Sequence, residues 1–263
     1  MTTYRNLLTE TDAGVGIVTL NRPDRHNAFD DETIAELADA MGRMTSDGAV
    51  RVVVISSTGK SFCAGADLNW MQRAAGYSLE ENQRDAGALA EMLLSVSECP
   101  KPVIARVQGP AYGGGVGLVA ACDIAVAAFD AKFALTEAKL GLIPAVIGPH
   151  VVAAIGERYA RRYMLTAESF SAAEAYRIGL IHEMVADTDG LDGAIGEWVG
   201  AILKNGPQAL AEAKALIRSI ANRPLETKVV DYTVERIAQV RVSAEGREGI
   251  AAFLQKRKPD WTL

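Results

Sequence analysis

Two short segments rich in small residues could bring backbone N–H groups to a single negatively charged oxygen. Gly113, Gly114 and Gly115 separate a β-like run at 102–108 from an apolar helix-like run, and residues 62–68 (FCAGADL) follow another apolar run. Glycine has no Cβ to hold other atoms away, and a helix that begins at such a loop presents unpaired N–H groups with partial positive charge. We therefore predict that one donor from each segment converges on the same oxygen.

A carboxylate among apolar residues is the second candidate for chemistry. Glu137 is followed by a loop of small apolar residues that contains Gly141 and Pro144 and could line a pocket. Burial raises the pKa of a carboxyl group and makes it a better proton acceptor or donor near neutral pH. The spacing also allows an ordinary surface ion pair between Glu137 and Lys139, so this alternative stays open.

The glycine segment has two other interpretations. A dinucleotide-binding fingerprint requires G-x-G-x-x-G with an acidic residue further along, whereas Gly113, Gly115 and Gly117 follow a different spacing and Asp130 is the available acid. A phosphate-binding Walker loop is excluded because no Gly-Lys-Ser or Gly-Lys-Thr follows. A dinucleotide site and a tight turn without any ligand remain open.

Composition limits the class of protein. The chain has 263 residues, of which 49% are hydrophobic and 23% charged, as expected for one globular domain with a helical appendage. A net charge of −6 argues against nucleic-acid binding, which requires a basic excess. The first residues lack the pattern of a secretory signal, and the longest uncharged run, 140–156, is interrupted by two prolines. We expect a cytoplasmic protein that does not enter a membrane.

The cysteines and histidines show no metal-binding pattern. Three cysteines without CxxC spacing lie among apolar residues, so we expect them to be reduced and buried. The histidines show no mutual spacing typical of zinc. We expect no metal site. These residues are Cys63, Cys99, Cys122, His26, His150 and His182.

Hydrophobic periodicity predicts the elements that must position these groups. Apolar runs at 15–20, 52–56, 103–107 and 124–128 have the length and composition of buried strands. Helical spacing follows Asp30 and two predicted capping boxes, 78–81 and 171–174. The chain reads as wholly helical from about Gly190, with apolar stripes at 209–221 and 227–240. This pattern predicts an α/β body at 1–189 and a helical region at 190–263.

Seven motifs, taken in order, cover nearly the whole chain, and together they resemble the crotonase, or enoyl-CoA hydratase and isomerase, family. They are LNRPDRHNAF at 20–29, SFCAGADL at 61–68, KPVIA at 101–105, GGGVGLVAACD at 113–123, TEAKLG at 136–141, AAEA with GLI at 172–181, and EGIAAFLQKR at 248–257. The resemblance implies a superhelix of ββα units with a C-terminal helical trimerisation region. It also implies a homotrimer or a dimer of trimers that binds acyl-CoA thioesters.

The resemblance assigns roles to individual residues. The N–H groups of Ala66 and Gly114 would hold the thioester oxygen while it carries enolate charge, and Glu137 would be the catalytic carboxylate. Coenzyme A is part of the substrate in this family, and no other cofactor is implied. The substrate-binding residues would be Arg25, Ala28, Ala64, Asp67, Leu68 and Gly113, with Phe253 and Lys256 added across a subunit contact.

The sequence departs from the best-known hydratases of this family at one position. Those enzymes carry two catalytic glutamates; Glu137 matches the second, whereas Gly117 stands at the position of the first. Segments 115–123 and 141–147 are similar to bacterial methylglutaconyl-CoA and isohexenylglutaconyl-CoA hydratases, which favours hydration, with 3-methylglutaconyl-CoA as a candidate substrate. An isomerase that uses Glu137 alone and a weakly catalytic acyl-CoA binder are the alternatives.

A methylglutaconyl substrate has a second carboxylate that would need a cation in the acyl pocket. Candidates for this cation are Arg73, Arg84 and His150, each of which could equally have a surface or packing role. The acyl chain could lie against Trp70, Met71 and Tyr77, although core packing explains these residues as readily.

Overall fold

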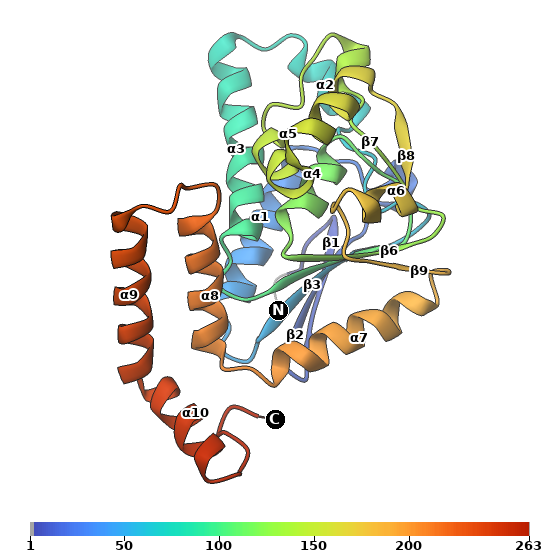
Figure 1. Ribbon diagram of the computed structural model, residues 1–263. Coiled ribbons are helices and arrows are strands. Elements are labelled where there is room, and N and C mark those ends of the chain that lie inside the picture. The colour runs from blue at the N-terminus through green and yellow to red at the C-terminus, as the bar shows by residue number, and fades with distance from the viewer. Residues whose placement is uncertain (1–2, 263) are drawn as a thin grey trace.

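A six-stranded sheet forms the centre of the computed structural model, which describes residues 3–262 (Figure 1). β1 runs antiparallel to β2, and the remaining pairs are parallel. Every residue of β3 is buried, because helices cover both faces of the sheet. In spatial order the strands are β1 (Leu7–Asp12), β2 (Val15–Leu20), β3 (Val52–Ser57), β4 (Val103–Val107), β6 (Ile124–Ala128) and β9 (Glu183–Val185).

A second, smaller layer of extended chain carries the segments of interest. It contains β5 (Ala111–Tyr112), β7 (Lys132–Ala134) and β8 (Ser169–Ser171), and isolated bridges Phe29–Ala66 and Cys63–Ala111 continue it. The chain repeatedly passes through a strand of the large sheet, then a short extended segment of the small layer, then a helix. This ββα repetition delivers the residues around 66, 113 and 137 to one layer.

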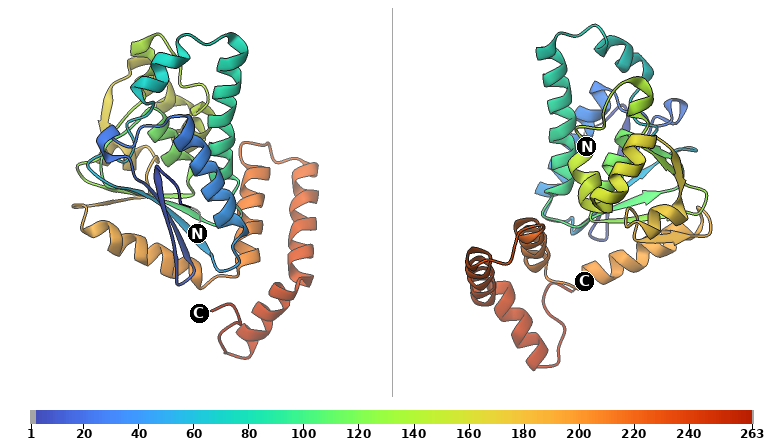
Figure 2. Two further views of the ribbon diagram at one scale, coloured as in Figure 1. Left: turned by 180° about the vertical axis from the view of Figure 1, so that it is seen from behind. Right: turned by 45° about the horizontal axis from the view of Figure 1, so that its top comes forward.

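Helices cover the two faces of the large sheet (Figures 1 and 2). On one face lie α1 (Asp31–Ser46), α3 (Leu79–Ser97) and α4 (Gly114–Ala121), with α5 (Gly148–Thr166) packed against α4, and on the other lies α7 (Gly190–Leu203). The side chain of Asp30 caps α1 by accepting the Thr33 N–H at 2.8 Å. At the start of α3, Ser78 and Glu81 form both bonds of a capping box.

The remaining helices are short or leave the body. They are η1 (Pro23–Arg25), α2 (Leu68–Ala74), η2 (Glu137–Leu140), α6 (Ala172–Arg177), α8 (Pro207–Ile220), α9 (Thr227–Val242) and α10 (Ala244–Leu254). The last three extend away from the sheet, as both views in Figure 2 show. None of the helices within residues 3–262 has both the length and the apolar composition needed to cross a bilayer.

The predicted α/β architecture is confirmed, with strands at all four predicted runs and helices after the predicted caps. The prediction of a second capping box at 171–174 is wrong for one of its two hydrogen bonds. Ser171 Oγ accepts the Glu174 N–H at 3.2 Å, but the Glu174 carboxylate binds the Tyr163 hydroxyl and Arg177 instead of the Ser171 N–H. The expected boundary at 189/190 coincides with the start of α7. However, α7 packs on the sheet, so the helices that project from the body begin with α8.

The cysteines differ in their burial. All three are free thiols; Cys63 and Cys99 are buried as expected, whereas Cys122 is only partly buried. Burial raises the pKa of Cys63 to about 12, which keeps this thiol protonated at neutral pH.

A partly buried cation links α8 to the body. Lys214 Nζ donates to Asp123 Oδ2 at 2.5 Å and to the Lys101 carbonyl at 3.0 Å. The same carboxylate oxygen accepts the Val103 N–H at 2.7 Å, so one atom connects α8 with β4. Burial raises the pKa of Asp123 although Lys214 lies beside it. α8 has no fully buried residue, and its partly buried Leu210 packs against the core beneath α7, so the Lys214–Asp123 pair adds a second attachment of α8 to the body.

Replacing Lys214 by Met should lower the free energy of unfolding by roughly 2 kcal/mol, because the Asp123 carboxylate then loses its cation in a largely buried position. Urea denaturation of the full chain measures this. The matched control is Arg161→Met, since the Arg161–Glu157 pair is about 70% exposed on both sides and should contribute less than about 1 kcal/mol. Equal losses of stability in the two variants would show that the Lys214–Asp123 pair contributes no more than an exposed ion pair.

Candidate active site

The N–H group of Ala66 is held in a defined direction by its own peptide unit. Phe29 donates its N–H to the Gly65 carbonyl at 2.7 Å, and Asp67 donates to the Phe29 carbonyl at 2.8 Å. Since the peptide is planar and trans, the Ala66 N–H points opposite to the bonded Gly65 carbonyl. Within residues 3–262 this N–H makes no hydrogen bond, and Ala66 is exposed.

The Gly113–Gly114 peptide repeats this arrangement at the start of α4. The Gly113 carbonyl accepts the Gly117 N–H at 3.1 Å, which is the first bond of the helix, so the Gly114 N–H points away from the helix. The preceding N–H, that of Gly113, donates to the Ala134 carbonyl at 2.9 Å. In the described part of the chain the Gly114 N–H is free, and the positive end of the α4 dipole adds to it.

The two loops touch, and glycine is required where they meet. Gly65 has φ +91°, and a Cβ added to it would lie 2.9 Å from the Tyr112 carbonyl oxygen and 3.7 Å from the Gly114 nitrogen. Gly113 has φ +49°. A side chain at Gly65 would combine positive φ with a collision against the Tyr112 carbonyl, and one at Gly113 would combine positive φ with a tight contact to the Glu137 carboxylate. The close approach of the two donor peptides therefore favours glycine at both positions.

Glu137 lies directly beside this junction, at the start of η2. A Cβ built on Gly113 would be 3.1 Å from Glu137 Oε1, and Glu137 Oε2 is buried without a hydrogen-bond partner in the described structure. Burial raises the pKa of Glu137. The alternative of a surface ion pair with Lys139 is wrong, since no ion pair of Glu137 forms among residues 3–262.

The position that the resemblance assigns to a first glutamate is filled by another side chain. A Cβ placed on Gly117 would lie 2.2 Å from Ile147 Cγ2 and 2.6 Å from Ile147 Cβ. Ile147 is 3% exposed and precedes α5. Glu137 thus approaches Gly113, the residue before α4, and Ile147 approaches Gly117 in the first turn of this helix. Ile147 therefore excludes any side chain at 117, and no spacing in the sequence indicated it.

The residues expected to bind coenzyme A divide into two groups. Those from the first 70 residues surround the Phe29–Ala66 bridge: Arg25 is exposed without an ion pair in the described structure, Leu68 is 80% exposed, and the Ala64 N–H donates to the His26 carbonyl. Ala28 and Asp67 are buried. Phe253 and Lys256, in contrast, lie in and just after α10, at the other end of the molecule (Figures 1 and 2). Within a single chain, the residues around the Phe29–Ala66 bridge and the pair Phe253 and Lys256 therefore do not form one site.

The candidate cations for a second substrate carboxylate have different surroundings. Arg73 pairs with Asp31, and Arg84 is exposed. His150 is partly buried, and this burial lowers its pKa. Of the aromatic candidates, Trp70 belongs to the core and donates from Nε1 to Asp85 at 3.0 Å, so packing explains it.

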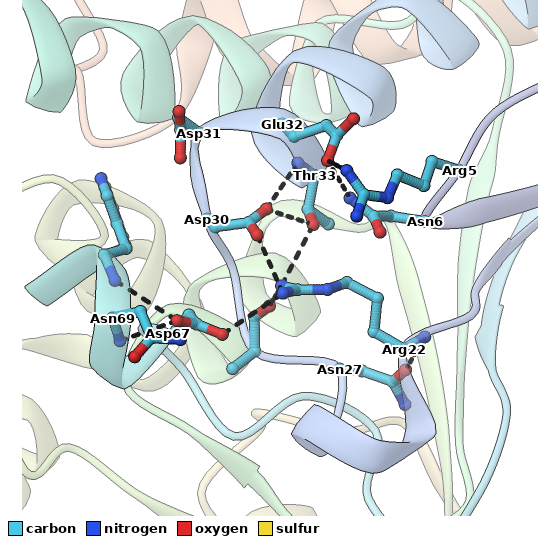
Figure 3. Close-up of polar contacts among 12 residues, drawn as sticks. Arg5, Asn6, Arg22, Asn27, Asp30, Asp31, Glu32, Thr33, Asp67 and Asn69 are labelled. Carbon is cyan, nitrogen blue, oxygen red and sulfur yellow. Dashed lines mark hydrogen bonds and ion pairs between the residues drawn. The ribbon is translucent and has the colours of Figure 1, made fainter.

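Sequence reasoning overlooked Arg22, although it lies within a quoted motif. Its side chain is 17% exposed, and its guanidinium pairs with Asp30 at 2.9 Å and with Asp67, the residue after Ala66, at 3.3 Å (Figure 3). Burial acts to raise the pKa of Asp67, but the N–H groups of Trp70 and Asn69 and the charge of Arg22 outweigh it and hold this pKa below its ordinary value.

The arrangement suits proton transfer beside a carbonyl group. Two preorganised N–H donors can stabilise an oxyanion, and a desolvated carboxylate beside them can move a proton at the neighbouring carbon. Within residues 3–262 no group of three or more His, Cys, Asp or Glu residues is placed to hold a metal ion.

Comparison with known proteins agrees with this chemistry. The sequence profile described as "Enoyl-CoA hydratase/isomerase" matches residues 10–263. A "Crotonyl-CoA hydratase" from Syntrophomonas wolfei is 33% identical over 264 residues, which cover 98% of both chains. A "1,2-epoxyphenylacetyl-CoA isomerase" from Escherichia coli is 33% identical over 270 residues, covering 97% of this chain and 98% of the relative.

The fold is shared with solved structures of the same group. The crystal structure of an enoyl-CoA hydratase from Shewanella pealeana superposes with a TM-score of 0.95 at 43% sequence identity, covering 98% of this chain and 96% of the other. The mixed α/β fold is thus the crotonase fold. The chain belongs to the enoyl-CoA hydratase/isomerase family.

Proposed function

We propose that the protein is an enoyl-CoA hydratase that adds water across the α,β double bond of an acyl-CoA thioester. The observation that carries this proposal is the unpartnered Glu137 carboxylate beside two free N–H donors. Relatives named as hydratases over nearly the full length support the same class of reaction. Addition of water is neutral in oxidation state, so the reaction needs no cofactor besides the coenzyme A of the substrate.

Glu137 serves both proton transfers in this proposal. The carboxylate takes a proton from water as the water oxygen bonds to the β-carbon, and the π electrons move onto the thioester as an enolate. The N–H groups of Ala66 and Gly114 hold the enolate oxygen. Glu137 then returns the proton to the α-carbon, the carbon–oxygen double bond reforms, and the carboxylate is regenerated. The desolvated carboxylate suits this work because its raised pKa makes it a stronger base.

Double-bond isomerisation is the second candidate, because Ile147 leaves room for one carboxylate only. In that reaction Glu137 would move a proton from the α- to the γ-carbon without water. One relative is named as an isomerase of another kind, which places isomerase activity among similar proteins. The third candidate function is binding of the thioester without turnover.

We propose 3-methylglutaconyl-CoA as the substrate, because segments 115–123 and 141–147 are similar in sequence to those of bacterial methylglutaconyl-CoA and isohexenylglutaconyl-CoA hydratases. The relatives named above are not named for this substrate, so the proposal of this substrate rests on the sequence alone. Of the candidate cations, Arg84 is exposed and free of ion pairs in the described structure, and it is the better partner for a second carboxylate than His150, because burial lowers the pKa of His150 and so favours its uncharged form.

We infer that the enzyme assembles as a homotrimer or a dimer of trimers through residues 190–263. The helices that leave the body expose large apolar side chains, which normally mark an interface. These include Val230, Val234, Ile237, Phe253 and Leu254. Assembly could also bring Phe253 and Lys256 of one subunit to the coenzyme bound near Arg25, Ala28, Ala64, Asp67, Leu68 and Gly113 of another.

Glu137→Gln should lower kcat for hydration at least about a hundredfold, since the amide cannot accept the proton of water. The loss of ultraviolet absorbance of crotonyl-CoA and then 3-methylglutaconyl-CoA measures hydration, and the appearance of this absorbance from a 3-enoyl-CoA measures isomerisation. Glu157→Gln, on the exposed side of α5, is the control that keeps wild-type rates. If the wild-type protein turns over the 3-enoyl-CoA but hydrates neither substrate, the proposed hydratase activity is wrong and the protein is an isomerase. Binding of the thioesters without either reaction would indicate the non-catalytic protein.

The raised pKa of Glu137 makes stability depend on pH in a defined direction. Because the folded state holds this proton more tightly than the unfolded state, stability is lost as pH rises from the ordinary value of 4.5 through the folded pKa. Glu137→Gln should therefore be more stable than wild type at about pH 8, and the two should differ little at about pH 4. Urea midpoints at both pH values test this; a difference independent of pH would contradict it. The acidic limb of kcat/KM should likewise lie above 4.5.

Gly117→Ala should destabilise the protein by about 1–3 kcal/mol, because the new Cβ collides with Ile147. In an Ile147→Ala background the same substitution should cost less, with a coupling of roughly 1 kcal/mol or more. Urea denaturation of both single variants and the double variant measures the coupling. Additive losses would show that Ile147 does not fill the space beside Gly117.

A further inference from the structure

Arg22 bridges the two chain segments that hold the Ala66 donor (Figure 3). Its Nη1 donates to the Ala28 carbonyl at 2.7 Å, and its Nη2 lies 2.9 Å from Asp30 Oδ2 and 3.3 Å from Asp67 Oδ2. Ala28 and Asp30 flank Phe29, while Asp67 follows Ala66. The guanidinium therefore contacts both sides of the Phe29–Ala66 bridge.

The two oxygens of the Asp67 carboxylate have separate tasks. Oδ1 accepts the Asn69 N–H at 2.8 Å and the Trp70 N–H at 3.3 Å and so caps α2, whereas Oδ2 faces Arg22. The carboxylate is 6% exposed, so its position is set by these contacts rather than by solvent. Helix α2 and the residue next to the donor are thus connected to Arg22 through one side chain.

We propose that Arg22 is a positioning residue that aims the Ala66 N–H at the enolate oxygen. This inference rests on the proposed function, since it concerns the donor that the hydration step uses. Arg22 does not touch the reacting atoms. It holds the Phe29–Ala66 bridge closed, and the bridge sets the plane of the Gly65–Ala66 peptide through the 2.7 Å bond from Phe29 to Gly65.

The charges explain why a cation is needed here. Asp30 and Asp67 bring two carboxylates to the guanidinium of Arg22, whose side chain is 17% exposed. Without the cation they would repel each other in a poorly solvated place and push the two segments apart. A donor displaced by about 1 Å can cost about a hundredfold in rate. A planar guanidinium can bind both carboxylates and a carbonyl at once, which the single ammonium group of lysine does less well.

Three variants test the proposal. Arg22→Met removes the cation, Arg22→Lys keeps the charge without the planar geometry, and Asp67→Asn keeps the α2 cap but removes the ionic contact, because asparagine caps helices as well as aspartate. The control is Lys214→Met, which breaks a comparable ion pair away from the donor. Should Arg22→Met fail to fold, Asp67→Asn decides.

Two readouts separate positioning from general stability. The first is the kcat and KM for crotonyl-CoA. The second is the ultraviolet band of the enolate that acetoacetyl-CoA forms when two donors hold its thioester oxygen, compared with the affinity for butyryl-CoA, which forms no enolate. We expect Arg22→Met and Asp67→Asn to lose about ten- to a hundredfold in kcat and most of the enolate band. The affinity for butyryl-CoA should change less than about threefold in Arg22→Met, and this affinity is compared for Arg22 variants only, because Asp67 is itself expected to lie beside the coenzyme. Arg22→Lys should fall between them and wild type.

The outcomes distinguish this inference from the function on which it rests. An unchanged enolate band in Arg22→Met and Asp67→Asn, or an equal loss of kcat in Lys214→Met, would overturn the positioning role alone. A wild-type enzyme that binds neither acetoacetyl-CoA nor butyryl-CoA would overturn the proposed function, and the positioning role with it.

Discussion

The contact between two glycine-containing loops is the constraint on which the rest of the site depends. Gly65 and Gly113 adopt positive φ and leave no side chain between their backbones, so two peptides whose carbonyls are already bonded can present their N–H groups side by side. Each N–H points outward because the carbonyl of the same planar peptide is held inward, by Phe29 in one case and by the first turn of α4 in the other. The ββα repetition serves this contact, since it places both loops in one layer of short strands.

The carboxylate beside these donors has no hydrogen-bond partner and no second carboxylate next to it in the described structure. Glu137 Oε2 is buried without a partner in the described structure, and Ile147 occupies the space where a side chain at 117 would lie. A second carboxylate would compete for the same proton and alter the pKa of the first. The chain has instead a glycine, a buried isoleucine and one desolvated glutamate. In the proposed hydration a single group therefore carries both proton transfers, and the proposed alternative, isomerisation, would use the same group.

Two ion-pair clusters and the exposed helices lie progressively further from the candidate site. Arg22 joins the caps of α1 and α2 around the first donor, whereas Lys214 joins α8 to the sheet through Asp123. Beyond α8, the apolar side chains of α9 and α10 are exposed, unlike those of α7, which pack on the sheet. The helices α9 and α10 therefore carry the exposed apolar surface on which the proposed assembly rests, whereas α7 belongs to the packed body.

The sequence by itself determined the α/β class, the four main strands, the capped helices and the three segments that carry the site. These follow from local causes: hydrophobic period, side chains that cap a helix, and glycines where the backbone must bend or be approached. The tertiary structure alone decided that Ile147 fills the place beside Gly117, that Arg22 bridges Asp30 and Asp67, that Glu174 leaves its predicted capping partner for Tyr163 and Arg177, and that α7 belongs to the body. Such contacts join residues far apart in the chain, or select among several partners of equal local merit, and only packing in three dimensions makes that choice.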